Sequence, residues 1–238
     1  MTFLRSLLFA IGAWLFTPPF FLSAFLLAPC TAMTRYRYIS NWAKCMLWWL
    51  RVTCGISHRI IGTENIPNHA SIILSKHQSA WETLAFQTIF PPQVWVLKRE
   101  LLWIPFFGWG LALTSPIAIN RTAGREALKQ LVAQGKDRLK RGFWVVIFPE
   151  GTRTAPNMTS KFHIGGAWLA SHSQATVVPV AHNAGEFWGK NSFIKKPGVI
   201  TVSIGKAIDC TGLKPDAINS QVETWINTEM LELKQYKS

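Results

Sequence analysis

The chain has 238 residues, a length that fits one large domain or a domain with an appendage. Charged residues make up only 16%, whereas 49% are hydrophobic and 12 residues are Trp. The formal charge is +13 and no acidic residue precedes Glu64, which favours an anionic lipid surface as partner. A nucleic-acid-binding module would not need about thirty uncharged, mostly apolar residues near its start, so the composition argues against that class.

The amino-terminal segment predicts a membrane anchor. Residues 6–34 carry no charge and exceed the roughly 20 apolar residues that span a bilayer. Pro18-Pro19 is expected to break a helix in the middle of this run, and Pro29 to break it again. A basic, Trp-rich stretch follows, which is typical of an interfacial helix. We expect residues 1–56 to form a membrane-anchoring helical segment, as a helix pair within one leaflet or a kinked span, and not a cleaved signal peptide.

From about residue 57 the pattern changes to short apolar runs that alternate with amphipathic segments. The run Phe143–Phe148 shows no alternation of polar and apolar residues, as expected of a strand buried on both faces. The expected strands are 58–62, 71–75, 94–97, 116–119, 143–148, 176–180 and 199–204, and the expected helices are 81–90, 124–141 and 217–234. This order predicts one α/β domain over residues 57–238, with a mixed, largely parallel central sheet flanked by helices.

A loop with catalytic potential follows the expected strand 71–75. Ser79 and Glu82 form a Ser-x-x-Glu capping box, so a helix should begin near Trp81. His77 then lies in the strand-to-helix loop, at the carboxyl end of a strand, where open α/β sheets bind ligands. The imidazole can fold back onto the Glu82 carboxylate, which leaves the other ring nitrogen to take a proton from a hydroxyl. In the alternative interpretation, Glu82 only caps the helix and His77 is an ordinary loop residue.

Two further segments suit an anion. Phe148-Pro-Glu-Gly-Thr-Arg153 ends the buried strand with a glycine turn and a guanidinium, which can bind a phosphate through two parallel hydrogen bonds. Lys98-Arg99 closes another expected strand, and an apolar ramp runs on to Gly108. Either segment alone is also compatible with an ordinary polar turn. Together with His77 they predict an amphiphilic substrate with an anionic head.

These residues resemble the 1-acyl-sn-glycerol-3-phosphate acyltransferase family, also called lysophosphatidic acid acyltransferases. His77-x4-Glu82 is similar to the family's His-x4-Asp motif with Glu for Asp, and Lys98–Gly108 to its second motif. Phe148–Arg153 matches its Phe-Pro-Glu-Gly-Thr-Arg motif letter for letter, and Val178-Pro179-Val180 its short Val-Pro segment. The likeness covers roughly residues 35–210. One departure besides Glu82 is Lys76, where many members have Asn.

The resemblance implies transfer of a fatty acyl group from acyl-CoA or acyl carrier protein to the sn-2 hydroxyl of lysophosphatidic acid. In that scheme His77 is the base and Glu82 orients it. The implied phosphate site consists of Lys98, Arg153 and Arg121, together with Glu150, Gly151 and Thr152. No metal and no cofactor beyond the acyl donor is expected, and the expected location is the cytoplasmic face of the cell inner membrane. The alternatives are an acyltransferase for another lysolipid, such as an ornithine lipid or a lysophospholipid, and a non-catalytic membrane-surface or nucleic-acid-binding module.

Overall fold

The computed structural model of the chain describes residues 1–104, 107–156, 158 and 160–234, without the side chains of Phe107 and Arg121. A seven-stranded sheet forms its centre, with the strand order β1-β7-β6-β2-β5-β3-β4. The strands are β1 Ile56–Ile61, β2 Ile72–Ser75, β3 Gln93–Lys98, β4 Ile117–Ile119, β5 Trp144–Ile147, β6 Val177–His182 and β7 Gly198–Ile204. The helices are α1 Thr2–Phe25, α2 Ala32–Cys54, α3 Trp81–Ile89, α4 Phe107–Ala112, α5 Arg125–Lys140, α6 Gly165–Ser173, α7 Ala184–Phe187 and α8 Pro215–Leu233.

The sheet is mixed and largely parallel, as the sequence predicts. Strands β6, β2, β5, β3 and β4 run in one direction, because every neighbouring pair among them is parallel. Strand β7 is antiparallel to β6, and β1 is parallel to β7, so these two strands run the opposite way. The carboxyl ends of the five parallel strands therefore meet at one edge of the sheet.

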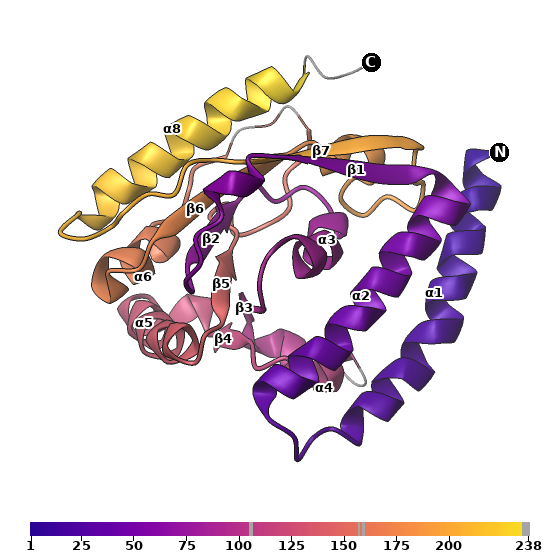
Figure 1. Cartoon of the computed structure of the whole chain (residues 1–238), viewed down its shortest axis with the longest axis horizontal. Helices are drawn as coiled ribbons and strands as arrows, with labels where there is room; N and C mark the ends of the chain where they lie inside the picture. Colours follow the sequence, from indigo (N-terminus) through magenta and orange to yellow (C-terminus); the bar gives the residue numbers. More distant parts are fainter. Residues whose placement is uncertain (105–106, 157, 159, 235–238) are drawn as a thin grey trace.

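Helices cover both faces of the sheet (Figure 1). Alternate residues of β2 show the division, since Ile72 and Leu74 pack with Leu169 of α6 and Ile218 of α8. Ile73 points to the other face, where it belongs to one cluster with Phe86 of α3, Leu50 of α2 and Phe9 of α1. The hydrophobic core thus lies in two layers, as expected for a sheet buried on both faces.

Helices α1 and α2 form an antiparallel pair at one side of the molecule (Figure 1). The expectation that Pro18-Pro19 breaks the first helix is wrong, because α1 runs through both prolines. Side chains of α2 contact α1 next to the prolines: the Phe20 ring stacks on Tyr38 at 4.8 Å, and the indole N–H of Trp42 donates to Thr17 Oγ1 at 3.2 Å.

Both ends of α1 are attached to the rest of the molecule. Near its start, the backbone N–H of Lys195 donates to Ser6 Oγ at 2.9 Å. Near its end, Phe21 packs so closely on Gly110 of α4 that a Cβ at Gly110 would lie 2.4 Å from the Phe21 ring. The two contacts are 15 residues apart, about 22 Å along a helix. Helix α1 therefore lies along the body and does not project from it.

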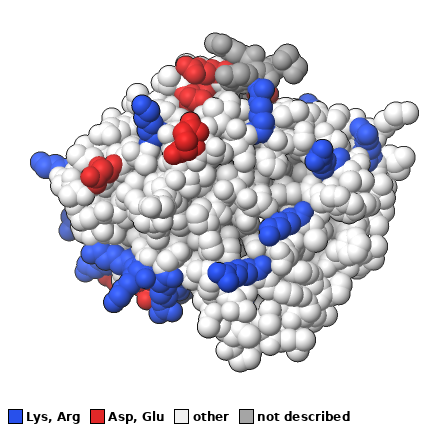
Figure 2. Space-filling model, viewed as in Figure 1, with Lys and Arg blue, Asp and Glu red and all other residues white. Residues whose placement is uncertain are grey.

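The outer face of α1 is apolar and exposed. Leu4, Leu8, Ile11 and Leu15 recur at helical spacing and remain between 48% and 69% exposed. Among the described helices, α1 is the one long and apolar enough to cross a membrane. Basic side chains gather over α5 and a few more lie over α2, whereas no acidic side chain occurs in α1 or α2 (Figure 2).

Candidate active site

The segments singled out in the sequence converge at the carboxyl edge of four neighbouring strands. Leu74 of β2 pairs with Ile147 of β5, so the loops that carry His77 and Arg153 leave the sheet at the same level. Strand β3 lies beside β5, and Lys98 at its end pairs with Ile119 of β4. With neighbouring strands about 4.8 Å apart, the ends of β2 and β4 lie about 14 Å apart across this edge.

His77 and Glu82 are in direct contact. The Nδ1–H of His77 donates to Glu82 Oε1 at 2.8 Å, with the Glu82 side chain fully buried and the His77 side chain 16% exposed. The imidazole also stacks flat on Phe148, with 3.8 Å between ring centroids and 9° between the planes. Among the described residues, none forms a hydrogen bond with His77 Nε2. The ring is therefore held from two sides, with Nε2 available to a ligand.

The same Glu82 oxygen also caps α3. Oε1 accepts from the backbone N–H groups of Gln78 at 2.9 Å and Ser79 at 2.8 Å. Ser79 Oγ accepts from the N–H of Trp81 at 3.1 Å, and α3 begins at Trp81 as predicted. Capping and contact with His77, which the sequence presents as alternatives, are thus combined in one atom. Glu82 Oε2 is buried and has no hydrogen-bond partner among the described residues.

The electrostatic surroundings keep Glu82 ionised. Burial alone would raise the pKa of its carboxyl, but the imidazoles of His182 and His77 and the N–H of Ser79 outweigh this effect and lower the pKa below its ordinary value. His182 is itself fully buried, and burial lowers the pKa of its imidazole despite the nearby Glu82 carboxylate. A neutral His182 beside an ionised Glu82 is the favoured state near neutral pH.

Glu150 contacts the backbone of His77, and both oxygens of its carboxylate accept hydrogen bonds from protein groups. Oε1 accepts from the backbone N–H of His77 at 2.9 Å. Oε2 accepts from Lys76 Nζ at 2.9 Å, from the Thr154 hydroxyl at 2.5 Å and from the Ser160 hydroxyl at 3.0 Å. The resemblance assigns Glu150 to the phosphate site, and this role stays a prediction. The contacts of Glu150 connect the loop after β5 with the loop after β2.

The remainder of the loop after β5 is more open. Gly151 has a φ of +70°, a left-handed conformation that favours glycine, and it forms the turn before Arg153. Thr152 is exposed, and its Oγ1 accepts from Lys190 Nζ at 3.4 Å. Arg153 is half-buried and has no ion-pair partner among the described residues. Its guanidinium is therefore available to an anion.

The other two expected cations lie farther along the same edge. Lys98 ends β3 and is exposed, two strands from β2 and thus about 10 Å away by strand spacing. Arg121 begins the short 3-10 helix after β4, but its side chain lies outside the described part of the structure. The structure joins His77, Glu82 and Glu150 by hydrogen bonds, whereas Lys98 lies apart from them at the same edge of the sheet.

Three residues had no role assigned from the sequence: Phe148, whose ring stacks on His77, Lys76, which pairs with Glu150, and His182. The signal for His182 was present, because it ends β6 two residues after the Val178-Pro179-Val180 segment, and β6 lies beside β2. No pattern of spacing could have revealed the other two. Within the described residues, no group of three His, Cys, Asp or Glu side chains is placed to hold a metal ion.

The sequence and the fold of this chain are similar to those of known proteins. The family model described as Acyltransferase matches residues 57–183. A 1-acyl-sn-glycerol-3-phosphate acyltransferase of Pseudomonas aeruginosa is 47% identical over 88% of this chain and 84% of its own length. A Saccharomyces cerevisiae protein of the same name is 29% identical, over 82% of this chain and 66% of its own. The crystal structure of the 1-acyl-sn-glycerophosphate acyltransferase PlsC from Thermotoga maritima covers 100% of this chain and 98% of its own, with a TM-score of 0.79. At 23% identity, that likeness shows the fold alone.

Proposed function

Because the chain belongs to the 1-acyl-sn-glycerol-3-phosphate acyltransferase family, we propose that it acylates the sn-2 hydroxyl of 1-acyl-glycerol-3-phosphate. The product is phosphatidic acid, a precursor in phospholipid synthesis. The observation that carries the proposal is the hydrogen bond between His77 and the buried Glu82, next to the loop that carries Arg153. A base beside an anion site suits a substrate that carries a hydroxyl and a phosphate.

In the proposed reaction, His77 is the general base. Its Nδ1–H is engaged by Glu82, so Nε2 takes the proton of the sn-2 hydroxyl. The hydroxyl oxygen forms a bond with the thioester carbonyl carbon, and the bond between that carbon and sulfur breaks. The imidazolium then returns the proton to the leaving thiolate. The negative charge of Glu82 stabilises the transient imidazolium, which a neutral side chain would do less well.

The phosphate of the acceptor is proposed to bind the loop after β5. Arg153 supplies a guanidinium that can donate two parallel hydrogen bonds, and the Gly151 turn lets the backbone approach the anion. The Thr152 hydroxyl contributes from the same loop. Lys98 and Arg121, at the ends of β3 and β4, are proposed as further cations along the edge, and Glu150 shapes the site through its contacts with His77 and Thr154.

The acyl donor is proposed to be a thioester of coenzyme A or of acyl carrier protein. The hydroxyl attacks this thioester directly, so the scheme involves no protein nucleophile, no metal and no cofactor besides the donor. Nucleic acid is not among the proposed partners. Membrane lipids are, because the lysolipid acceptor and the product both reside in a bilayer.

The protein is proposed to act at the cytoplasmic face of the cell inner membrane. Its exposed α1 face and its basic amino-terminal half suit an anionic bilayer surface. Since α1 contacts the body near both ends, we propose that it lies within one leaflet and does not span the bilayer. All four cysteines are free thiols, which is consistent with a reducing compartment.

The test is an acyl-transfer assay of the purified full-length protein in lipid vesicles. The panel of acceptors includes lysophosphatidic acid, lyso-ornithine lipid and lysophospholipids with larger heads, each with both types of donor. We expect the highest kcat/KM with lysophosphatidic acid, and a loss of about 10²–10⁴-fold in His77→Ala, the range for a positioned base. Preference for another acceptor would reassign the substrate. Equal turnover by folded His77→Ala would remove the proposed base.

A further inference from the structure

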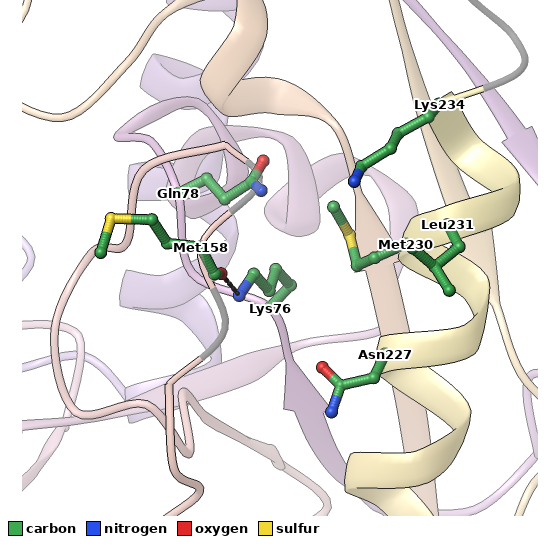
Figure 3. Close-up of a pocket in the computed structure, with 7 residues that line it drawn as sticks. All are labelled: Lys76, Gln78, Met158, Asn227, Met230, Leu231 and Lys234. Carbon is green, nitrogen blue, oxygen red and sulfur yellow. Dashed lines mark hydrogen bonds between the residues drawn. The ribbon is translucent and has the colours of Figure 1, made fainter.

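Lys76 is a buried lysine in the position directly before His77. The residue is 3% exposed, and its ammonium donates to Glu150 Oε2 at 2.9 Å and to the carbonyl oxygen of Met158 at 3.2 Å. Figure 3 shows the Lys76 ammonium turned toward the Met158 carbonyl, beside a cavity of about 50 Å³ that α8 covers. An ammonium in such a place needs a paired carboxylate, since an unpaired buried charge is very costly.

The partner of Lys76 also holds the backbone of His77. While Glu150 Oε2 binds the ammonium, Oε1 accepts from the His77 N–H at 2.9 Å. The carbonyl on the other side of His77 accepts from the N–H of Thr154 at 2.8 Å. Both backbone groups of His77 are thus bonded to residues of the loop after β5.

The peptide that precedes His77 is fixed from a further side. The carbonyl of Lys76 accepts from His182 Nε2–H at 2.9 Å and from the Ser75 hydroxyl at 2.9 Å. The N–H of Ala184 donates to His182 Nδ1 at 3.3 Å, which assigns the ring proton to Nε2. These contacts restrict the His77 backbone as long as Glu150 keeps its position. The ammonium of Lys76 is the cation that pairs with the buried Glu150 carboxylate.

We propose that Lys76 is a positioning residue for His77, acting through Glu150. Its ammonium neutralises the carboxylate that joins the loop after β2 to the loop after β5, so the base and Arg153 are held as one rigid unit. The inference rests on the proposed role of His77 as base. Lys76 itself does not touch the substrate, because its ammonium is buried and already bonded.

The experiment compares Lys76→Met, Glu150→Gln and the double variant in the full-length protein. Lys76→Met leaves a buried carboxylate without its cation, so we expect kcat to fall about 10- to 100-fold, the effect of a small misplacement of a catalytic group. The lysolipid KM should change less than about threefold, because Arg153 remains. In the double variant no buried charge is unpaired, and the amide carbonyl introduced by Glu150→Gln can still accept from the His77 N–H. We therefore expect kcat to return to within about fivefold of wild type.

A matched control is Lys129→Met, which makes the same chemical change at a lysine side chain that is 78% exposed on α5. It should leave kcat unchanged. A wild-type kcat in Lys76→Met, or a double variant no faster than Lys76→Met, would overturn the proposal. A rise in KM without loss of kcat would also overturn it, because Lys76 would then be a substrate ligand.

A readout independent of turnover separates this proposal from the proposed function. The ring ¹⁵N resonances of His77 report its tautomer and its bond to Glu82, whatever lipid the enzyme uses. We expect Lys76→Met to shift these resonances and the double variant to restore them. If the resonances move as expected but no lysolipid is acylated, the positioning role stands and the assigned reaction fails. Unchanged resonances in Lys76→Met would contradict the positioning role itself.

Discussion

At the scale of single residues, one oxygen atom of Glu82 serves both the helix and the imidazole. Glu82→Gln keeps an acceptor for the three N–H donors but removes the charge beside His77. We expect its melting temperature to stay near that of wild type while kcat falls about 10- to 150-fold, as for loss of a charge-assisted hydrogen bond worth about 1.5–3 kcal/mol. Thermal denaturation and steady-state kinetics measure the two effects.

Glu82→Asp is the complementary variant. It keeps the charge but withdraws the carboxylate by about 1.5 Å, one carbon–carbon bond, so the three bonds to Oε1 cannot all persist. We expect lower thermal stability than in Glu82→Gln but a higher kcat. A Gln variant as fast as wild type would show that Glu82 serves the helix only.

His182 makes stability depend on pH. Burial lowers the pKa of its imidazole in the folded protein below the roughly 6.5 of the unfolded chain. Below about pH 6.5 the unfolded chain therefore binds the proton more readily, and the free energy of unfolding decreases as the pH falls. One such group contributes at most about 1.4 kcal/mol per pH unit.

His182→Gln retains a donor for the Lys76 carbonyl but does not titrate. We expect denaturant titrations between pH 5 and 8 to show a shallower pH dependence for this variant than for wild type. Some dependence should remain, because burial also lowers the pKa of His58. The exposed His163→Gln is the control and should keep the full wild-type slope. An unchanged slope in His182→Gln would mean that the fold does not lower the pKa of His182.

At the scale of elements, the sequence predicted the helices and strands that have a clear periodic pattern of apolar residues within their own segment. Every strand and helix expected after residue 57 is present, because periodicity and the capping signals agree there. Helix α6 went unnoticed because it is short and begins with two glycines. The reason for the second glycine is tertiary: a Cβ at Gly166 would lie 2.5 Å from Leu74. The contacts of α1 with α2 on either side of Pro18-Pro19 could likewise not be read from the local sequence.

The candidate active site was also only partly predictable from the sequence. The sequence placed His77 and Glu82 together because they are close in the chain, and it placed Arg153 at a strand end. It could not place Lys76 beside Glu150, since 74 residues separate them and the contact depends on the order of strands in the sheet. Contacts between residues that are far apart in the sequence could be identified only once the order of the strands was known.

The exposed face of α1 offers a test of the membrane assignment. Leu8 and Leu15 are 48% and 59% exposed on this face, so truncating them should not disturb the fold. If the face enters a bilayer, Leu8→Ala/Leu15→Ala should lower binding to anionic vesicles about 10- to 100-fold, given about 0.8 kcal/mol per buried methylene and side chains of which about half is exposed to the bilayer. Leu231→Ala on α8, 63% exposed, is the matched control and should bind as wild type. Equal vesicle binding of both variants would show that this face of α1 does not contact the membrane.

At the scale of the whole molecule, the division at residues 56 and 57 remains a prediction, and the packing bears on it. Phe9 and Leu50 lie in one hydrophobic cluster with Ile73 of the central sheet. Loss of each such side chain costs about 2–5 kcal/mol, against a total stability of about 5–15 kcal/mol for a typical protein. We therefore expect a fragment of residues 57–238 to lack a cooperative unfolding transition.

Circular dichroism during a denaturant titration is the measurement. A fragment that unfolds cooperatively near the wild-type midpoint would instead establish residues 57–238 as an autonomous domain and residues 1–56 as a separable anchor. Deletion of residues 1–34 alone should release the protein from vesicles. Persistent tight binding would move the anchor to α2 or to the body.

The attachment of α1 at both ends has a kinetic consequence. If the outer face of α1 inserts into a bilayer, the carboxyl edge of the sheet is held at a fixed distance from the membrane surface, because α4 contacts α1 through Gly110 and Phe21. The enzyme then meets its lysolipid by lateral diffusion, in two dimensions. Its rate should follow the mole fraction of lysolipid in the membrane and fall on surface dilution with inert lipid, even when the bulk concentration of lysolipid is held constant.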